Sequence, residues 1–337
     1  MPLWLMVIDG KGAGGGQVTE ESNGISHGAG VAVEQGKSTA SVDMPPWLQE
    51  ALQRCEQAHD HWCDVSGARA HYVQWGEPGR QGLLLIHGGA AHAHWWDFVA
   101  PFLSDDFDVS AMDLFGMGQS DHLPAYSASG FAEEVLAVCE HWGHKQDIIL
   151  VAHSFGAMPA IKAASLAPER FAGLVIMDSA VLLPAFMAAQ RELGASSPFG
   201  RGRIYPDREL ALSRYRLVPP QDCAHPLMLR HLAEHGLERH GDGWRWRFDP
   251  GFITKTDYEA VHRLVPALDI PCVFLYGERS ALFPPEQVAS LPEVLGPHVP
   301  IVTLPAAGHH MMLDRPMDVV AKLRELLQPW RCRERQG

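Results

Sequence analysis

The chain has 337 residues, of which 46% are hydrophobic and 20% are charged, and its formal net charge is −13. So acidic a chain is not expected to bind nucleic acid or anionic membrane surfaces, because both favour basic patches. No apolar run approaches the roughly 18 residues that a membrane-spanning helix needs. Composition is that of an ordinary globular protein, and the charge says nothing further about the small-molecule substrate that the motifs below predict.

The cysteines indicate a reducing compartment. They show no paired spacing and no C-x-x-C motif, so we expect free thiols and a cytoplasmic location. The first nine residues are mostly apolar but have no basic flank and no convincing cleavage site, so no signal peptide is expected. The oligomeric state is not indicated. The six cysteines are Cys55, Cys63, Cys139, Cys223, Cys272 and Cys332.

Residues 1–43 differ from the rest of the chain. They are rich in Gly and Ser, as in KGAGGG and EQGKSTAS, and have no sustained hydrophobic periodicity. Such a stretch buries too little apolar surface to offset its ordering entropy, so we expect a disordered tail. An alternative hypothesis is that Met44 is the natural start of the protein.

From Met44 onward, strand and helix patterns follow one another regularly. Two antiparallel-strand candidates (61–67 and 68–77) follow a short amphipathic helix at 46–58. Short apolar runs typical of buried parallel strands then alternate with helical patterns, which predicts βαβ units and a mostly parallel sheet. The strand candidates are 82–88, 107–114, 147–154, 173–180, 271–278 and 299–308, and the helical ones are 94–104, 129–142, 155–167, 285–291 and 314–328.

The alternation breaks once, over nearly 90 residues that contain no clear strand pattern. This interval is far too long for a crossover loop, and several of its segments resemble helices. We therefore expect a helical cap at 181–266, inserted into a core formed by 44–180 and 267–332.

The segment VAHSFGA predicts a nucleophilic serine. A strand precedes Ser154 and a helix follows it, and the small residues Ala152 and Gly156 flank it at two positions on either side. A tight strand-to-helix turn needs small residues there, and it places the hydroxyl above the edge of the sheet. The usual pattern is G-x-S-x-G, in which Ala152 replaces the first glycine. An ordinary helix N-cap is the alternative role for this serine.

The segment LLIHGGAAHAHWW follows a buried strand and predicts an oxyanion hole. A nucleophilic serine generates a tetrahedral oxyanion, which requires preorganised N–H donors. We expect these donors to be the backbone amides of Gly89 and Phe155. Trp95 and Trp96 are expected to line the substrate pocket, although they could instead only pack the adjacent helix against the core.

His92 and His94 have the spacing of metal ligands, but no second cluster of ligands accompanies them in the sequence. We therefore expect no metal site. The segment PAAGHHMMLDRP, after the last predicted strand, supplies the expected general base. His309 in this loop points back toward the serine and can take its proton, with His310 as the rival.

These motifs, together with MDLFGMGQSD at 112–121, resemble those of the α/β-hydrolase superfamily over about Met44 to Trp330. The resemblance implies an α/β-hydrolase fold with a mostly parallel eight-stranded sheet, flanking helices and an inserted cap, and no cofactor. It also implies a structural role for Asp113. The capped architecture is similar to that of serine ester hydrolases, whereas relatives with an Asp nucleophile are disfavoured by Ser154.

The resemblance leaves the third catalytic residue open. Relatives place an acid after the seventh strand in a G-x-x-D pattern, but here the expected position holds Ser280. Asp178, which ends the sixth strand 24 residues after Ser154, is our first candidate, because some members of the superfamily carry their acid there. Glu278 and the absence of any acid are the alternatives.

The predicted function is cleavage of a carboxylic ester through an acyl-enzyme intermediate. A C–C bond hydrolase of the meta-cleavage type is an alternative, although its usual oxyanion loop and the Asn before the nucleophile are absent. A non-catalytic ligand-binding protein with the same fold is another.

The expected cap carries a net charge of +2, so the rest of the chain carries −15. Within it, GWRWRF alternates aromatic and basic side chains. If this segment is extended, Arg245 and Arg247 lie on one face, from which one of them could bind an anionic part of the substrate. The alternative is that both arginines only pair with nearby carboxylates.

Overall fold

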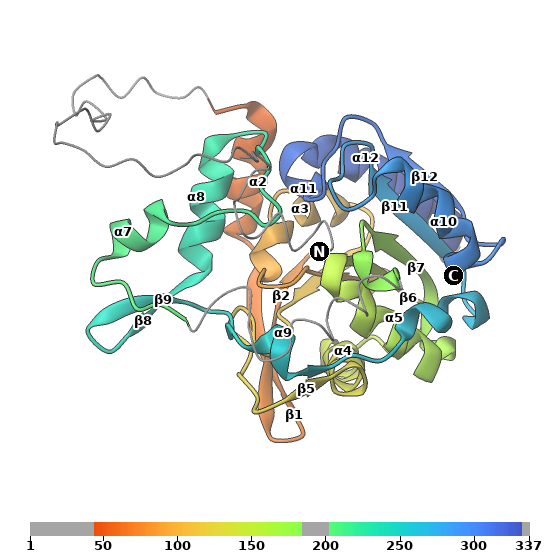
Figure 1. Ribbon diagram of the computed structural model, residues 1–337, viewed down its shortest axis with the longest axis horizontal. Coiled ribbons are helices and arrows are strands. Elements are labelled where there is room, and N and C mark those ends of the chain that lie inside the picture. Colours follow the sequence, from red (N-terminus) through yellow and green to blue (C-terminus); the bar gives the residue numbers. More distant parts are fainter. Residues whose placement is uncertain (1–43, 184–201, 332–337) are drawn as a thin grey trace, which may run out of the picture.

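The computed structural model describes residues 44–183 and 202–331. The segment 1–43 and Cys332 lie outside the described residues. The central feature is an eight-stranded sheet with the order β1-β2-β4-β3-β6-β7-β11-β12 (Figure 1). β1 and β2 pair antiparallel, β2 pairs antiparallel with β4, and the other neighbours are parallel. The strands are β1 (His59–Val65), β2 (Ala68–Trp75), β3 (Gly82–Ile86), β4 (Asp108–Met112), β6 (Ile148–His153), β7 (Phe171–Met177), β11 (Cys272–Gly277) and β12 (Ile301–Leu304).

Helices cover both faces of this sheet, so its central strands are apolar throughout. In β3, Leu84 and Ile86 belong to one hydrophobic cluster, whereas Leu83 and Leu85 belong to the cluster on the other face. The first cluster includes α4 (Ala128–Trp142), α5 (Ala157–Leu166) and α10 (Pro285–Leu295). The second includes α2 (Pro46–Cys55), α3 (Ala100–Leu103), α11 (Met311–Asp314) and α12 (Pro316–Leu327).

Short 3₁₀ turns connect several of these elements. Two of them bear on the candidate site, namely η1 (Ala93–Trp96) after β3 and η2 (Ser154–Gly156) after β6. The others are η3 (Pro168–Arg170), η4 (Ala180–Leu182), η5 (Val261–Arg263), η6 (Val265–Ala267) and η7 (Gln328–Trp330). In the described ranges no helix is long and apolar enough to cross a membrane.

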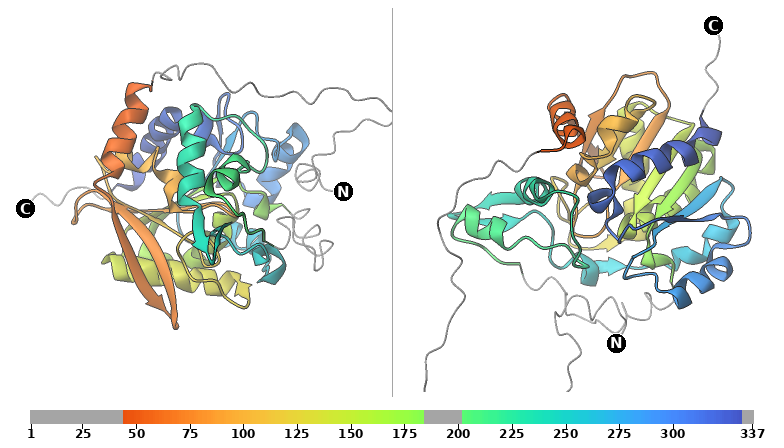
Figure 2. Two further views of the ribbon diagram at one scale, coloured as in Figure 1. Left: turned by 90° about the vertical axis from the view of Figure 1, so that its left-hand side faces the viewer. Right: turned by 90° about the horizontal axis from the view of Figure 1, so that it is seen from above.

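The described part of the expected cap contains strands as well as helices, so a purely helical cap is a wrong description of it. It holds α7 (Arg208–Ser213), α8 (Pro226–His235), α9 (Phe252–Lys255) and a hairpin of β8 (Leu237–His240) and β9 (Gly243–Trp246). In addition, β10 (Thr256–Asp257) pairs with β5 (Tyr126–Ser127) of the core. The β8–β9 turn and its alternating aromatic residues favour a hairpin, which the helical periodicity of the flanking segments obscured. Figures 1 and 2 show α7, α8 and this hairpin together, beside the sheet.

Candidate active site

Ser154 lies at a strained turn between β6 and α5. Its φ is +52°, a left-handed conformation that is uncommon for a residue with a side chain. Gly156 makes the turn possible, because a Cβ at this position would lie 2.4 Å from the carbonyl oxygen of His87. The Ser179 hydroxyl donates a hydrogen bond of 2.6 Å to the carbonyl of Ser154. This geometry is that of a nucleophile elbow, which holds the serine hydroxyl above the sheet.

The structure brings Asp178 and His309 together. Asp178 directly follows β7 and is fully buried, and its Oδ1 lies 2.7 Å from Nδ1 of His309. Two further donors bind this carboxylate: Gly277 N–H to Oδ2 at 2.9 Å and the Ser280 hydroxyl to Oδ1 at 2.7 Å. A carboxylate in this position fixes the orientation and tautomer of the imidazole and stabilises its protonated form. The Nε2 atom of the ring is then available to exchange a proton with a nucleophile.

The two rivals from the sequence lie elsewhere. Glu278 is exposed, and its carboxylate accepts a hydrogen bond of 2.8 Å from the amide of Ala306. His310 precedes α11, and its ring packs edge-on against Trp95 with 5.1 Å between centroids. The contact of Asp178 with His309 therefore favours Asp178 over Glu278 and His309 over His310.

Two residues that the sequence did not single out hold the His309 loop in place. The Nε2–H of His153 donates a hydrogen bond of 3.0 Å to the carbonyl of His309. Burial lowers the pKa of His153 well below its ordinary value, so this ring is neutral. On the other side, Gly308 N–H donates to Asp314 at 2.7 Å. The sequence offered one signal for the role of His153: it directly precedes Ser154, so it must lie at the end of β6, close to the candidate site.

The loop after β3 lies against the elbow. A Cβ on Gly88 would be only 3.2 Å from Cβ of Ser154. His87 shapes this loop, since its Nδ1–H donates to the Gly88 carbonyl at 2.7 Å and its Nε2 accepts from Leu114 N–H at 3.1 Å. Within the described residues, the Gly89 amide has no protein hydrogen-bond acceptor. This amide and that of Phe155, directly after Ser154, are the expected oxyanion donors.

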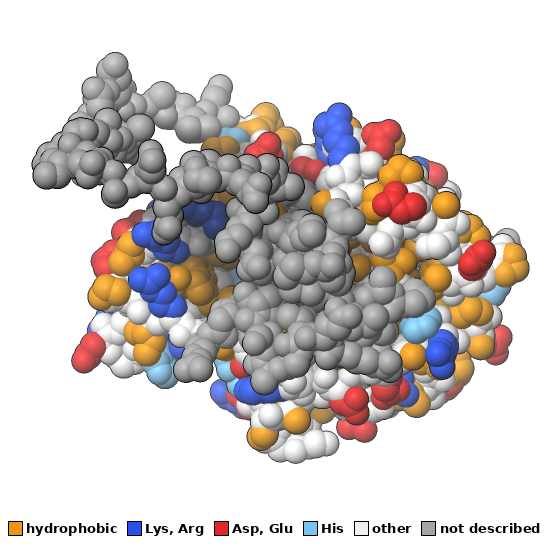
Figure 3. All heavy atoms as spheres, in the orientation of Figure 1, with side chains coloured by type: hydrophobic (Ala, Val, Ile, Leu, Met, Phe, Trp, Pro, Cys, Tyr) orange, Lys and Arg blue, Asp and Glu red, His pale blue; other side chains and the backbone are white. Residues whose placement is uncertain are grey.

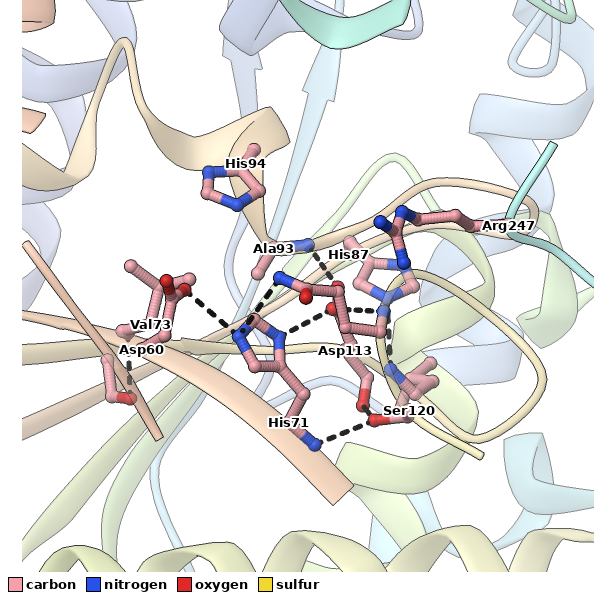
Figure 4. Close-up of polar contacts among 12 residues, drawn as sticks. Asp60, His71, Val73, His87, Ala93, His94, Asp113, Ser120 and Arg247 are labelled. Atoms are coloured by element: carbon pink, nitrogen blue, oxygen red, sulfur yellow. Dashed lines mark hydrogen bonds and ion pairs between the residues drawn. The ribbon is translucent and has the colours of Figure 1, made fainter. Parts of the chain in front are cut away.

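Asp113 has the structural position that the resemblance implied (Figure 4). Its Oδ2 lies 2.7 Å from Nδ1 of the buried His71 and accepts Gln119 N–H at 2.7 Å. Its Oδ1 accepts the amide of Ala93 at 2.6 Å, which anchors the first residue of η1. The carbonyl of Asp113 accepts the hydroxyl of Ser120 at 2.7 Å. Asp113 thus connects β2, the end of β4 and η1.

A cavity of about 460 Å³ lies between the loop after β3 and the cap, and neither Ser154 nor His309 is among the residues that line it. Trp95 lines it beside residues 89–92, as expected. The prediction for Trp96 is wrong, because this side chain is fully buried in the core and is not part of the cavity wall. Arg245 and Arg247 both line the cavity, together with three further arginines, Arg203, Arg214 and Arg216.

The chain matches a known family over more than half of its length. The family described as the alpha/beta hydrolase fold matches residues 82–316, and the chain belongs to it. The chain is 24% identical to lipase LipV of Mycobacterium tuberculosis, over 77% of this chain and 98% of that protein. It is 27% identical to N-formylmaleamate deformylase of Pseudomonas putida, over 74% of this chain and 89% of that protein.

A solved structure supports the fold independently. The crystal structure of E-2-(acetamidomethylene)succinate hydrolase matches with a TM-score of 0.65 and 19% identity, covering 80% of this chain and 99% of that one. The protein is therefore a hydrolase-family member with the α/β-hydrolase fold and with lipase and esterase relatives.

Proposed function

We propose that this protein is a serine hydrolase that cleaves a carboxylic ester, with Ser154 as nucleophile, His309 as general base and Asp178 as the third member of the triad. The observation that carries the proposal is the 2.7 Å contact between Asp178 Oδ1 and His309 Nδ1, in a loop that is hydrogen-bonded to His153, the residue before a serine held at φ +52°. Its support is geometric, because a buried carboxylate that orients an imidazole next to a nucleophile elbow is the requirement for acyl transfer.

The proposed reaction has two steps. His309 Nε2 takes the proton of Ser154 as its oxygen attacks the ester carbonyl, and the amides of Gly89 and Phe155 bind the oxyanion. Collapse of this intermediate expels the alcohol, which receives the proton from His309, and leaves an acyl-serine. Water, deprotonated by His309, then attacks the acyl-serine, and release of the carboxylic acid returns the proton to Ser154. No cofactor is needed.

The charge of the cavity wall supports an anionic substrate. Figure 3 shows basic side chains gathered over the part of the surface formed by the cap. Arg245 and Arg247 both pair with Glu238, at 2.6 and 3.4 Å, so their charges are partly compensated. Among the described residues, Arg214 and Arg216 have no carboxylate partner. An ester that bears a carboxylate would supply one, since the planar guanidinium fork matches a carboxylate.

A second candidate is cleavage of an amide bond by the same machinery. It is favoured by the relative whose name makes it a deformylase of N-formylmaleamate, a compound that carries both an amide and a carboxylate. Matched ester and amide substrates with the same acyl group discriminate between the two.

The contact between Asp178 and His309 argues against a non-catalytic binding protein. Separately, the free thiols of the five described cysteines support a reducing, cytoplasmic location.

A fluorophosphonate tests the proposal, because it reacts only with an activated serine. The Ser154 oxygen would form a bond to phosphorus, fluoride would leave, and the serine proton would pass to His309. We expect labelling of the wild type and of the exposed control Ser165→Ala, and none of Ser154→Ala. Labelling that persists in Ser154→Ala, or an unlabelled wild type, would overturn the proposal.

A further inference from the structure

A cluster of histidines lies where the cap helix α8 meets the 3₁₀ turn η1 of the core. His94 belongs to η1, and Asp97 follows its last residue. His231 and His235 are one helical turn apart on α8, so they share a face of that helix. The rings of His94 and His235 stack with 3.7 Å between their centroids, and Figure 4 shows His94 apart from the hydrogen bonds around Asp113.

Asp97 joins the two elements. One of its oxygens, Oδ2, lies 3.1 Å from Nδ1 of His94 and 2.6 Å from Nε2 of His231. The residue is only 1% exposed, and its other oxygen, Oδ1, has no hydrogen-bond partner among the described residues. A buried carboxylate oxygen without a donor is costly, and a bound cation removes that cost.

The donor atoms converge in the way that a metal site requires. One atom each from His94, Asp97 and His235 lies within 4.8 Å of the others. In a tetrahedral zinc site, metal–ligand distances of 2.0–2.1 Å place ligand atoms about 3.3 Å apart. The His94–Asp97 pair, at 3.1 Å, already has about this spacing, whereas the His235 atom, within 4.8 Å of both, must move closer to bind the same ion. Both histidines are accessible to solvent, so an ion has a path of entry.

We propose that His94, Asp97 and His235 bind a divalent transition-metal ion of the zinc type. Imidazole and carboxylate ligands suit this class of ion, and the remaining coordination position is left for water. His231 acts as a positioning residue through its hydrogen bond to Asp97, as residues around metal ligands commonly do. Because two ligands come from the core and one from the cap, the ion would fasten α8 to η1.

The site is separate from the candidate triad. His92, between the oxyanion loop and His94, donates its Nε2–H to the carbonyl of Leu232 on α8 at 3.0 Å, so the core already contacts the same helix. A second histidine group, His153, His309 and His310, also has ligand atoms within 4.8 Å of one another, but it lies at the proposed active site. Any test must therefore distinguish the two groups.

The experiment uses the full chain without a histidine tag, stripped of metal by a chelator and titrated with Zn²⁺ by calorimetry. We expect one tight site per chain. At 100-fold excess over the dissociation constant, Tm should rise by about 5 °C or more. His235→Ala and, as a second ligand variant, His94→Gln should weaken binding by more than about 100-fold, whereas His231→Ala should weaken it by about 10- to 100-fold. The matched control His298→Ala, an exposed histidine far from the cluster in the sequence, should bind as the wild type does.

Two results would overturn the proposal. One is unchanged affinity and an unchanged Tm rise in both ligand variants. The other is loss of the tight site in His310→Ala with its retention in His235→Ala, which would place the ion at the active-site histidines. Circular dichroism of each variant without metal checks that a loss of binding is not a loss of folding.

Discussion

Ser280 donates its hydroxyl hydrogen to Asp178 Oδ1 at 2.7 Å, and the same oxygen contacts His309. Ser280 occupies the position at which the resemblance placed the acid. β7 and β11 are parallel neighbours in the sheet, so residues after their ends reach the same point. Where relatives carry a carboxylate after β11, this chain has a serine. The hydroxyl of that serine donates to the carboxylate that follows β7.

We expect Asp178→Asn to lower kcat by about 10⁴-fold, because the amide stabilises neither the correct tautomer nor the imidazolium. Glu278→Gln is the matched control and should change kcat little, since its carboxylate only accepts the Ala306 amide. Steady-state hydrolysis of a p-nitrophenyl ester measures both. If Glu278→Gln shows the large loss instead, the acid belongs to β11.

The short distance between the two strand ends predicts a rescue. In the double variant Asp178→Asn/Ser280→Asp, the new carboxylate starts from a side chain that already lies within hydrogen-bond distance of residue 178. We expect it to recover about 10-fold or more of the kcat lost in Asp178→Asn, because it can again orient His309. The single variant Ser280→Asp should be impaired, since two adjacent buried carboxylates repel each other.

Ser154→Ala should reduce turnover to below about 1% of the wild type, because the acyl-enzyme cannot form. Adding His309→Ala should cost little more, since the two residues act as one unit. Active-site titration with a chromogenic ester, in protein purified away from host esterases, makes the measurement. Near-additive losses would contradict the shared mechanism.

The arginines that line the cavity should make kcat/KM depend on the charge of the substrate. Arg214→Ala should lower kcat/KM on a carboxylate-bearing ester by about 10-fold or more, and on a matched neutral ester much less. Arg245→Ala and Arg247→Ala should show smaller selectivity, because Glu238 already pairs with both. Arg263→Ala, an exposed cap residue outside the cavity wall, is the control. Equal losses on both esters would leave the arginines with a structural role.

Asp113 makes the stability of the fold dependent on pH. Burial by itself would raise the pKa of Asp113, but the hydrogen bond and charge of His71 outweigh it and hold this pKa below its ordinary value. The ionised carboxylate therefore stabilises the fold above the unfolded-state pKa of about 3.9, and this contribution is lost as pH falls below it.

We accordingly expect Asp113→Asn to cost about 3 kcal/mol or more near pH 7, and the difference from wild type to narrow below about pH 4. Urea unfolding at a series of pH values measures this difference. The partly exposed Asp121→Asn is the control, with an expected cost within about 1 kcal/mol. A difference that stays constant to pH 3 would show that the charge of Asp113 is not what stabilises the fold.

Much of the fold was predictable because its signals are local. Six apolar runs and two antiparallel-strand patterns predicted the eight strands of the sheet, and the small residues on either side of Ser154 predicted the elbow. Local periodicity could not show that the cap contains a hairpin, nor that Trp96 turns into the core while its neighbour Trp95 faces the cavity. Adjacent side chains in a 3₁₀ turn point in different directions, and only the packing around the turn decides which of them is exposed to the cavity.

The sequence by itself determined the class of fold and predicted the serine and histidine of the proposed triad, since strand, turn and helix patterns depend on neighbouring residues. Tertiary structure alone decided the partner of His309, because Asp178 and Glu278 follow different strands and only the sheet order brings Asp178 within 2.7 Å of the imidazole. The same holds for the histidine cluster. His94 and His235 are 141 positions apart in the sequence, so the proposed ligand from the cap becomes visible only when α8 packs on η1.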